Sequence, residues 1–102
     1  MSIVKVADAA EEDLKEIWAY IAERNPEAAS KFIKEITGRF AILRDYPQMG
    51  REQHTLLVNL RSFAVKDYII FYQPFEDGVD ILRVLHGARD IESIFEGFLD
   101  SL

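Results

Sequence analysis

The side chains best suited to acid–base chemistry are one histidine and a few cations in the second half of the sequence. The imidazole of His86 can act as an acid or a base, because its ordinary pKa lies close to neutral pH. Cations can stabilise negative charge that develops in a transition state. The cations nearest to His86 in the predicted elements are Arg61, Arg83, Arg89 and Lys66. The set of candidate catalytic side chains is small, because the other histidine, His54, belongs to a separate loop.

Each of these side chains also has a structural role that its position favours. His86 lies at the end of a predicted strand, where a hydrogen bond to a loop is the more common use. Arg83 stands between apolar neighbours, so we expect an ion pair with a carboxylate, which Asp90 or Glu92 could provide. Arg61 is equally suited to an internal ion pair and to a surface contact.

The sequence contains no motif for a cofactor or a metal. It has no cysteine, no glycine-rich phosphate loop and no histidine and carboxylate spacing typical of a metal site, so neither is expected. The acidic run Glu11-Glu12-Asp13 fits the start of a helix, where carboxylates interact favourably with the helix dipole. Arg89 and Asp90 are placed to fix the turn after the last strand.

Two helices are predicted ahead of this half of the chain. Asp8 and Glu11 form a capping-box pattern, and Asn25 followed by Pro26 is a second start signal. The few residues between the two helices force an antiparallel hairpin. Gly38 would cost about 1 kcal/mol in a helix interior, so we expect a close helix crossing there. The apolar face of the first helix comprises Ala10, Leu14, Ile17, Trp18 and Ile21.

Short runs rich in β-branched and aromatic residues predict strands at 60–65, 68–73 and 79–86, with a short first strand at 3–6. Tight connections at 66–67 and 74–78 make the last three an antiparallel meander. In the last two strands both alternating sets of residues are apolar, so both faces of the sheet need a cover. The hairpin can cover one face. An amphipathic tail helix over 91–102, or a partner chain, would cover the other.

These elements predict an α+β fold in one domain over residues 1–102. An N-terminal strand and an antiparallel helical hairpin pack on a small antiparallel β-sheet in the order β-α-α-β-β-β, and a C-terminal helix follows. A composition that is 49% hydrophobic and 12% aromatic is sufficient to fill one core.

Charge and composition also bear on location and partners. The absence of cysteine is typical of a reducing compartment, and we expect the cytoplasm. No signal peptide and no apolar run of roughly 20 residues is present, so no membrane association is expected. The net charge of -6 repels phosphate backbones and argues against direct nucleic-acid binding.

Exposed aromatic side chains often dominate binding between proteins. Tyr20 lies off the apolar face of its helix, and Tyr46 and Phe75 lie in predicted loops. We therefore expect Tyr20, Tyr46 and Phe75 to contact partner proteins.

Five spaced segments give the chain a family resemblance. They are DLKEIWAYI at 13–21, NPEAA at 25–29, PQMGR at 47–51, LRSF at 60–63 and ILRVLHGARD at 81–90. In this order, over roughly residues 3–91, they resemble the ParE branch of the RelE/ParE toxin superfamily. The resemblance implies a sheet backed by a helical hairpin, a plasmid-stabilisation type of toxin, and a ParD-like or related antitoxin that neutralises it. It further implies DNA gyrase as the poisoned target, and a homodimer or a toxin–antitoxin hetero-oligomer.

Two alternatives remain open beside this hypothesis of a noncatalytic toxin. RelE-type toxins cut messenger RNA on the ribosome, where a ribose 2′-hydroxyl attacks the adjacent phosphate. An enzyme of that type would draw on Arg61, Arg83, His86 and Arg89 in this chain. The third hypothesis is an inactive toxin homologue that persists as a binding partner.

Overall fold

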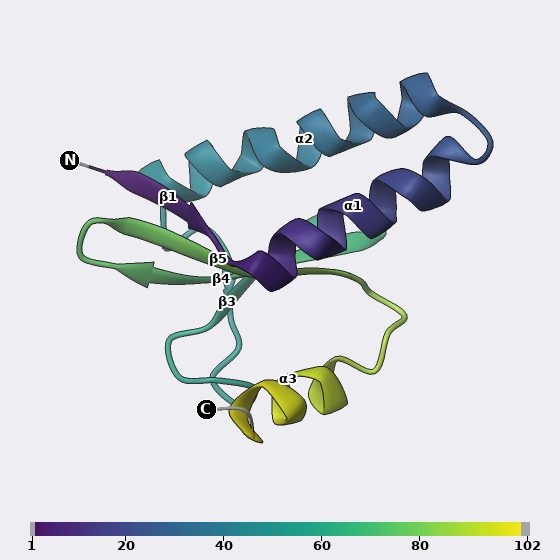
Figure 1. The fold of residues 1–102 in the computed structure, drawn as a ribbon. Helices are drawn as coiled ribbons and strands as arrows, with labels where there is room; N and C mark the ends of the chain where they lie inside the picture. The colour runs from purple at the N-terminus through teal and green to yellow at the C-terminus, as the bar shows by residue number, and fades with distance from the viewer. Residues whose placement is uncertain (1, 101–102) are drawn as a thin grey trace.

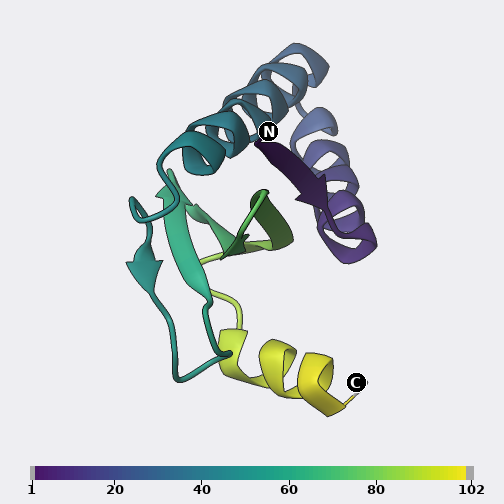
Figure 2. The same cartoon turned by 90° about the vertical axis from the view of Figure 1, so that its left-hand side faces the viewer.

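The computed structural model describes residues 2–100 and confirms the predicted α+β fold. The elements in chain order are β1 (Ile3–Val6), α1 (Asp8–Ala22), α2 (Pro26–Asp45), β2 (Arg51–Glu52), β3 (Arg61–Val65), β4 (Tyr68–Phe75), β5 (Gly78–His86) and α3 (Ile91–Asp100). The strands form one sheet in the order β1-β5-β4-β3-β2. The α1–α2 hairpin lies on one side of this sheet and α3 on the other (Figure 1 and Figure 2).

The sheet differs from the predicted one at both edges. β1 pairs with β5 in parallel, so the sheet is not wholly antiparallel, and the two-residue strand β2 was not predicted. Ile3 of β1 pairs with Gly78 at the start of β5. Gly78 has a φ of +154°, and a side chain there would collide with the backbone of Ile3. A glycine is therefore required where the two strands meet.

The two helix starts were predicted with different success. Asn25 caps α2 as expected, because its side-chain oxygen accepts a hydrogen bond from the backbone N–H of Ala28 at 3.1 Å. The capping box at Asp8 was wrong. Ala7 is the cap of α1, it makes no side-chain hydrogen bond, and Asp8 lies in the first turn. Its carboxylate still suits that position, because the N-terminal end of a helix dipole is positive.

Two expectations about the hairpin interior were also wrong. Trp18 was assigned to the apolar face of α1, but it is 42% exposed and its indole N–H donates to Ser30 Oγ of α2 at 3.1 Å. Gly38 was expected at a close helix crossing. It is exposed instead, and among residues 2–100 nothing beyond its chain neighbours and the backbone of its own helix lies within 4 Å of the position a Cβ would take. Trp18 thus links the two helices through this hydrogen bond, and Gly38 takes no part in their packing.

Apolar side chains form two clusters on opposite faces of the sheet. The larger cluster lies between the hairpin and the sheet and includes Ile17, Ile36 and Ile70. The smaller cluster lies under α3. Its fully buried members are Leu60, Phe71, Leu85 and Phe95. Helix α3 thus provides the cover that the two-sided strands required, and residues 101–102 of the predicted tail helix lie outside the described residues.

Within residues 2–100, no helix combines the length and the apolar character that crossing a bilayer would need.

Candidate functional site

A buried ion pair fixes α1 against the last strand. Both oxygens of Asp13 accept hydrogen bonds from Arg83, at 2.7 Å from Nε and 2.8 Å from Nη2. Asp13 is 5% exposed, and its hydrogen bond raises the pKa of the Arg83 guanidinium above the ordinary arginine value, against the opposing effect of burial. The expected partners of Arg83, Asp90 and Glu92, are therefore wrong.

The same carboxylate also completes the edge of the sheet. β1 pairs with β5 only as far as Ile81, and the chain then turns into α1. Beyond that point the backbone N–H of Val84 donates to Asp13 Oδ2 at 2.9 Å. Asp13 thus supplies the hydrogen-bond acceptor that a neighbouring strand would otherwise provide to Val84. This contact stabilises the fold, because a buried backbone N–H without an acceptor costs free energy.

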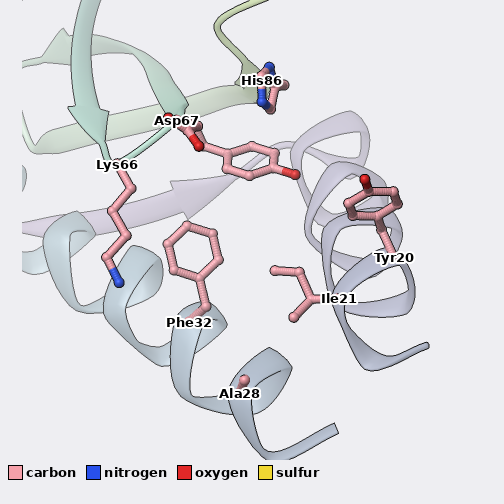
Figure 3. A pocket seen from close by; sticks show the side chains of 8 residues that line it. Tyr20, Ile21, Ala28, Phe32, Lys66, Asp67 and His86 are labelled. Atoms are coloured by element: carbon pink, nitrogen blue, oxygen red, sulfur yellow. The ribbon is translucent and has the colours of Figure 1, made fainter. Parts of the chain in front are cut away.

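An open groove of about 580 Å³ lies between the hairpin and the end of the sheet (Figure 3). Its lining comes from α1, α2, the β3–β4 turn and the end of β5. The lining side chains include Tyr20, Ile21, Ala28, Phe32, Tyr68 and His86. A second hollow of about 180 Å³ shares three of them, Tyr20, Tyr68 and His86, and extends toward Arg89. The groove is therefore mostly apolar, with polar groups toward one end.

Three rings run in a row along the groove. The Phe32 and Tyr68 ring centroids are 5.6 Å apart, and the Tyr68 and His86 centroids are 5.1 Å apart with the planes nearly perpendicular. Edge-to-face contacts of this kind stabilise aromatic pairs. Burial, and then the nearby Tyr20 and Asp67, raise the pKa of Tyr68 above its ordinary value of 10.0. Its hydroxyl therefore stays protonated at neutral pH and can donate a hydrogen bond.

The β3–β4 turn forms one rim of the groove. Lys66 has a positive φ of 54°, and its ammonium lies 5.4 Å from the centroid of the Phe32 ring and 3.4 Å from Glu35 Oε1. The carbonyl of Asp67 accepts a hydrogen bond from the backbone N–H of Gly87 at 2.8 Å. These contacts tie the turn to α2 and to the loop after β5, so the rim has a defined position.

His86 is held by the loop that follows it, as expected for a residue at a strand end. Its Nδ1 accepts a hydrogen bond from the backbone N–H of Ala88 at 3.0 Å. A neutral imidazole that accepts at Nδ1 carries its proton on Nε2. His86 therefore presents an N–H donor on its other side.

Arg61 lies far from His86. The strand register pairs Arg61 with Tyr72, and Tyr68 with His86. Four residues of strand at about 3.4 Å each, roughly 14 Å in all, separate the two positions along the sheet. Arg61 donates to Gln48 Oε1 at 2.6 Å and to the carbonyl of Gly50 at 2.6 Å, so it anchors the loop before β2.

The remaining predicted site residues are spread over the molecule. Arg89 is exposed and lines the smaller hollow beside His86. Tyr20 is 73% exposed on the rim of the groove, while Tyr46 is 68% exposed at the distant end of α2. Phe75 ends β4, and the ammonium of Lys5 lies 4.9 Å from its ring centroid. Of the eight residues singled out from the sequence, the structure brings together Tyr20, Lys66, His86 and Arg89 around the groove and the hollow beside it.

Sequence analysis missed Asp13 and most of the groove lining. Asp13 carried a usable signal, because it lies three residues after Ala10 and four before Ile17, on the apolar face of α1. A carboxylate on such a face needs a buried partner. Phe32 and Tyr68 carried no signal, since they meet only through the packing of α2 on the sheet. Among residues 2–100, no cluster of histidine and carboxylate groups is arranged to hold a metal ion.

Comparison with known proteins gives consistent matches. The family described as "ParE toxin of type II toxin-antitoxin system, parDE" matches residues 4–91. "Toxin ParE3" of Caulobacter vibrioides is 31% identical over 80 residues, which are 78% of this chain and 80% of that protein. "Toxin RelE3" of the same organism is 29% identical over 90 residues, 87% of this chain and 98% of that protein.

A solved structure shares the fold. It is a chain of the "Chromosomal ParDE TA system from P. aeruginosa", with a TM-score of 0.71 and 20% sequence identity. The superposition covers 84% of this chain and 96% of that one. The segment after residue 91, which contains most of α3, lies beyond the part that the family matches.

Proposed function

Because the chain belongs to the ParE toxin family of type II toxin–antitoxin systems, we propose that it acts by binding proteins, one that it inhibits and an antitoxin that neutralises it. As the target we propose DNA gyrase, which the family resemblance implies. The proposed place of action is the cytoplasm, where gyrase works.

The open groove is the observation that carries this proposal. It is lined by apolar side chains, and Tyr20, 73% exposed, stands on its rim. Apolar surface of this kind is typical of sites where a helix or an extended segment of another protein docks. The description of the similar solved structure names a ParDE system, which supports an antitoxin as a partner of this chain.

The second candidate function is cleavage of messenger RNA, which the similarity to "Toxin RelE3" favours. It would require Arg61, Arg83, His86 and Arg89 to act on one phosphate. Arg83 is bound by Asp13, and Arg61 is bound by the loop at Gln48 and Gly50. These contacts favour the noncatalytic proposal. The third candidate, an inactive homologue, would bind an antitoxin and leave both targets untouched.

One pair of assays separates the three candidates. The purified chain is added to gyrase supercoiling reactions and to translating ribosomes with a messenger RNA. Inhibition of supercoiling without RNA cleavage is the expected result. RNA cleavage that disappears in His86→Ala would establish the second candidate, and no effect in either assay, with the antitoxin still bound, would establish the third.

A matched pair of variants tests the groove. Ala28→Arg fills it, whereas Ala41→Arg makes the same change on an exposed position thirteen residues later in α2, about 20 Å away. We expect the cognate antitoxin to bind Ala28→Arg about tenfold more weakly than Ala41→Arg, a difference of about 1.4 kcal/mol. Equal binding of the two variants in calorimetry would place the antitoxin elsewhere.

A further inference from the structure

We infer that the groove recognises a helical partner segment that carries an apolar side chain and a carboxylate three or four residues apart on one face. This inference rests on the proposed function, since it names the chemistry of the polypeptide that the groove would bind. It is carried by the different character of the two ends of the groove.

The apolar end can hold a large aliphatic or aromatic side chain. Ile21 of α1 and Ala28 and Phe32 of α2 face one another across it, as Figure 3 shows. Ala28 is exposed, and Ile21 and Phe32 are only partly buried, so part of this lining is in contact with water. Covering it with an apolar side chain releases that water, at about 25 cal/mol for each Å² buried.

The other end offers hydrogen-bond donors that are not used within residues 2–100. The hydroxyls of Tyr20 and Tyr68 have no hydrogen-bond partner in this part of the chain. His86 presents its Nε2–H, because Nδ1 already accepts from Ala88. A carboxylate, with two oxygens, can accept from more than one of these donors, and hydrogen bonds to an ionised acceptor are about twice as strong as neutral ones.

The charges around this end place the carboxylate near Arg89. Arg89 is exposed beside His86 and has no ion pair among the described residues. Of the nearby acids, Asp13 is bound by Arg83, and Glu16 lies close enough to Arg83 to help raise its pKa. Asp67 lies beside Lys66 on the β3–β4 turn and its charge helps raise the pKa of Tyr68, so Arg89 is the cation that would attract an incoming carboxylate to this end.

A helical peptide fits these two ends better than RNA does. Side chains three or four residues apart on a helix lie on one face with their Cβ atoms about 5–6 Å from each other, and the length of the side chains adds to this reach toward the two ends. RNA would bring a phosphate at every nucleotide toward a chain whose net charge is -6, whereas the peptide brings a single carboxylate beside Arg89.

Peptide selection tests the inference with no antitoxin present. A phage library of random peptides of about twelve residues, roughly three helical turns, is selected on the full wild-type chain and counter-selected on Ala28→Arg. The expected peptides carry Leu, Ile, Met, Phe or Trp three or four residues from Asp or Glu. Peptides that depend on the groove but lack the acid, or carry a base in its place, would overturn the inference, as would a selection that yields no such peptide.

The best peptide is then synthesised with its acid and with the matching amide. In fluorescence polarisation the amide should bind wild type and Tyr46→Phe about tenfold more weakly or worse. This penalty should shrink in Tyr20→Phe and His86→Phe, which each remove one donor. Equal affinity of acid and amide, or an unchanged penalty in both groove variants, would refute the carboxylate site, as would displacement of the peptide by a short single-stranded RNA.

The two proposals can fail separately. An antitoxin that binds wild type and every groove variant with equal affinity contradicts the groove inference and leaves the toxin–antitoxin function intact. A groove that selects acidic amphipathic peptides in a chain that binds no antitoxin does the reverse.

Discussion

At the scale of single residues, Asp13 connects the fold to the groove. Its carboxylate binds Arg83 and the backbone of Val84, and α1 carries Tyr20 and Ile21 two turns further on. The ion pair therefore sets where one wall of the groove lies relative to β5. Asp13 is only 5% exposed. Removing one member of such a buried ion pair destabilises the fold, because the charge of the other member is then left without compensation.

Asp13→Ala is expected to lower the free energy of unfolding by about 3 kcal/mol, since it leaves Arg83 and the Val84 amide unpaired. Asp13→Asn should cost less, because the amide oxygen still accepts one hydrogen bond. Urea denaturation measures both changes. Glu12→Ala is the control, as its contact with Lys15 is exposed and should be worth less than about 1 kcal/mol. A loss in Asp13→Ala no larger than in this control would contradict the role assigned to Asp13.

Tyr72 links the sheet to the loop after α2. Its hydroxyl donates to the carbonyl of Pro47 at 2.8 Å and accepts from the N–H of Gly50 at 2.9 Å. Burial is the main cause that raises the pKa of Tyr72 above its ordinary value of 10.0. The folded state thus prefers the neutral phenol, so this contribution to stability is complete below pH 10 and is lost as the pH rises through the folded-state pKa.

Tyr72→Phe should therefore lower stability at neutral pH by about 1–3 kcal/mol, because two polar groups lose their partner. The difference in free energy of unfolding between wild type and Tyr72→Phe should become smaller above pH 10. There the tyrosine ionises more readily in the unfolded state than in the folded state, which destabilises wild type and has no counterpart in the variant. Tyr68, whose pKa is also raised, is present in both proteins and cancels from the difference. Thermal unfolding in a pH series checks this, and a difference that stays constant or widens would be the opposite result.

At the scale of elements, an irregularity in the pairing of β4 and β5 gives β5 two apolar faces. The register shifts between Phe71 and Tyr72, which pair with Arg83 and Ile81, so Leu82 is an extra residue in β5. A bulge of this kind changes which face the following residues meet. Leu82 and Leu85 thus pack with α3, while Ile81 and Val84 pack with the hairpin.

Removal of residues 92–102 tests α3. Phe95 is 1% exposed and its ring centroid lies 5.1 Å from that of Phe71. The deletion should lower stability by about 3 kcal/mol or more, as loss of a buried Phe does, or should drive self-association through the uncovered face. Urea denaturation and sedimentation velocity report the two outcomes. A truncated chain that stays monomeric with unchanged stability would show that α3 contributes nothing to the fold.

At the scale of the whole molecule, the two apolar clusters share the central strands. Ile70 and Phe71 are neighbours in β4 and belong to opposite clusters. If either the hairpin or α3 detaches, the central strands against which the other one packs become exposed. The two clusters should therefore unfold together.

Ile36→Ala in the larger cluster and Phe95→Ala in the smaller one should each lower the free energy of unfolding by about 2–5 kcal/mol. In both variants we expect a single unfolding transition whose midpoint is lower than that of wild type. Circular dichroism reports the helices, and Trp18 fluorescence reports the hairpin. Transitions that fail to coincide, or a Phe95→Ala change confined to a separate early phase, would mean that the α3 side unfolds on its own.

The sequence by itself determined the helices, every strand except β2 and the need for a second cover, because each depends on residues a few positions apart. Apolar spacing, Asn25 with Pro26, and the two-sided strands were enough for these. Only the tertiary structure decided that Arg83 pairs with Asp13, seventy residues earlier, that β1 lies parallel to β5, and that Tyr20, Phe32, Tyr68 and His86 line one groove. Such contacts join residues that are far apart in the sequence, and they depend on how the helices and strands pack together. A local pattern reports only on residues a few positions apart, so it cannot predict which distant segments meet.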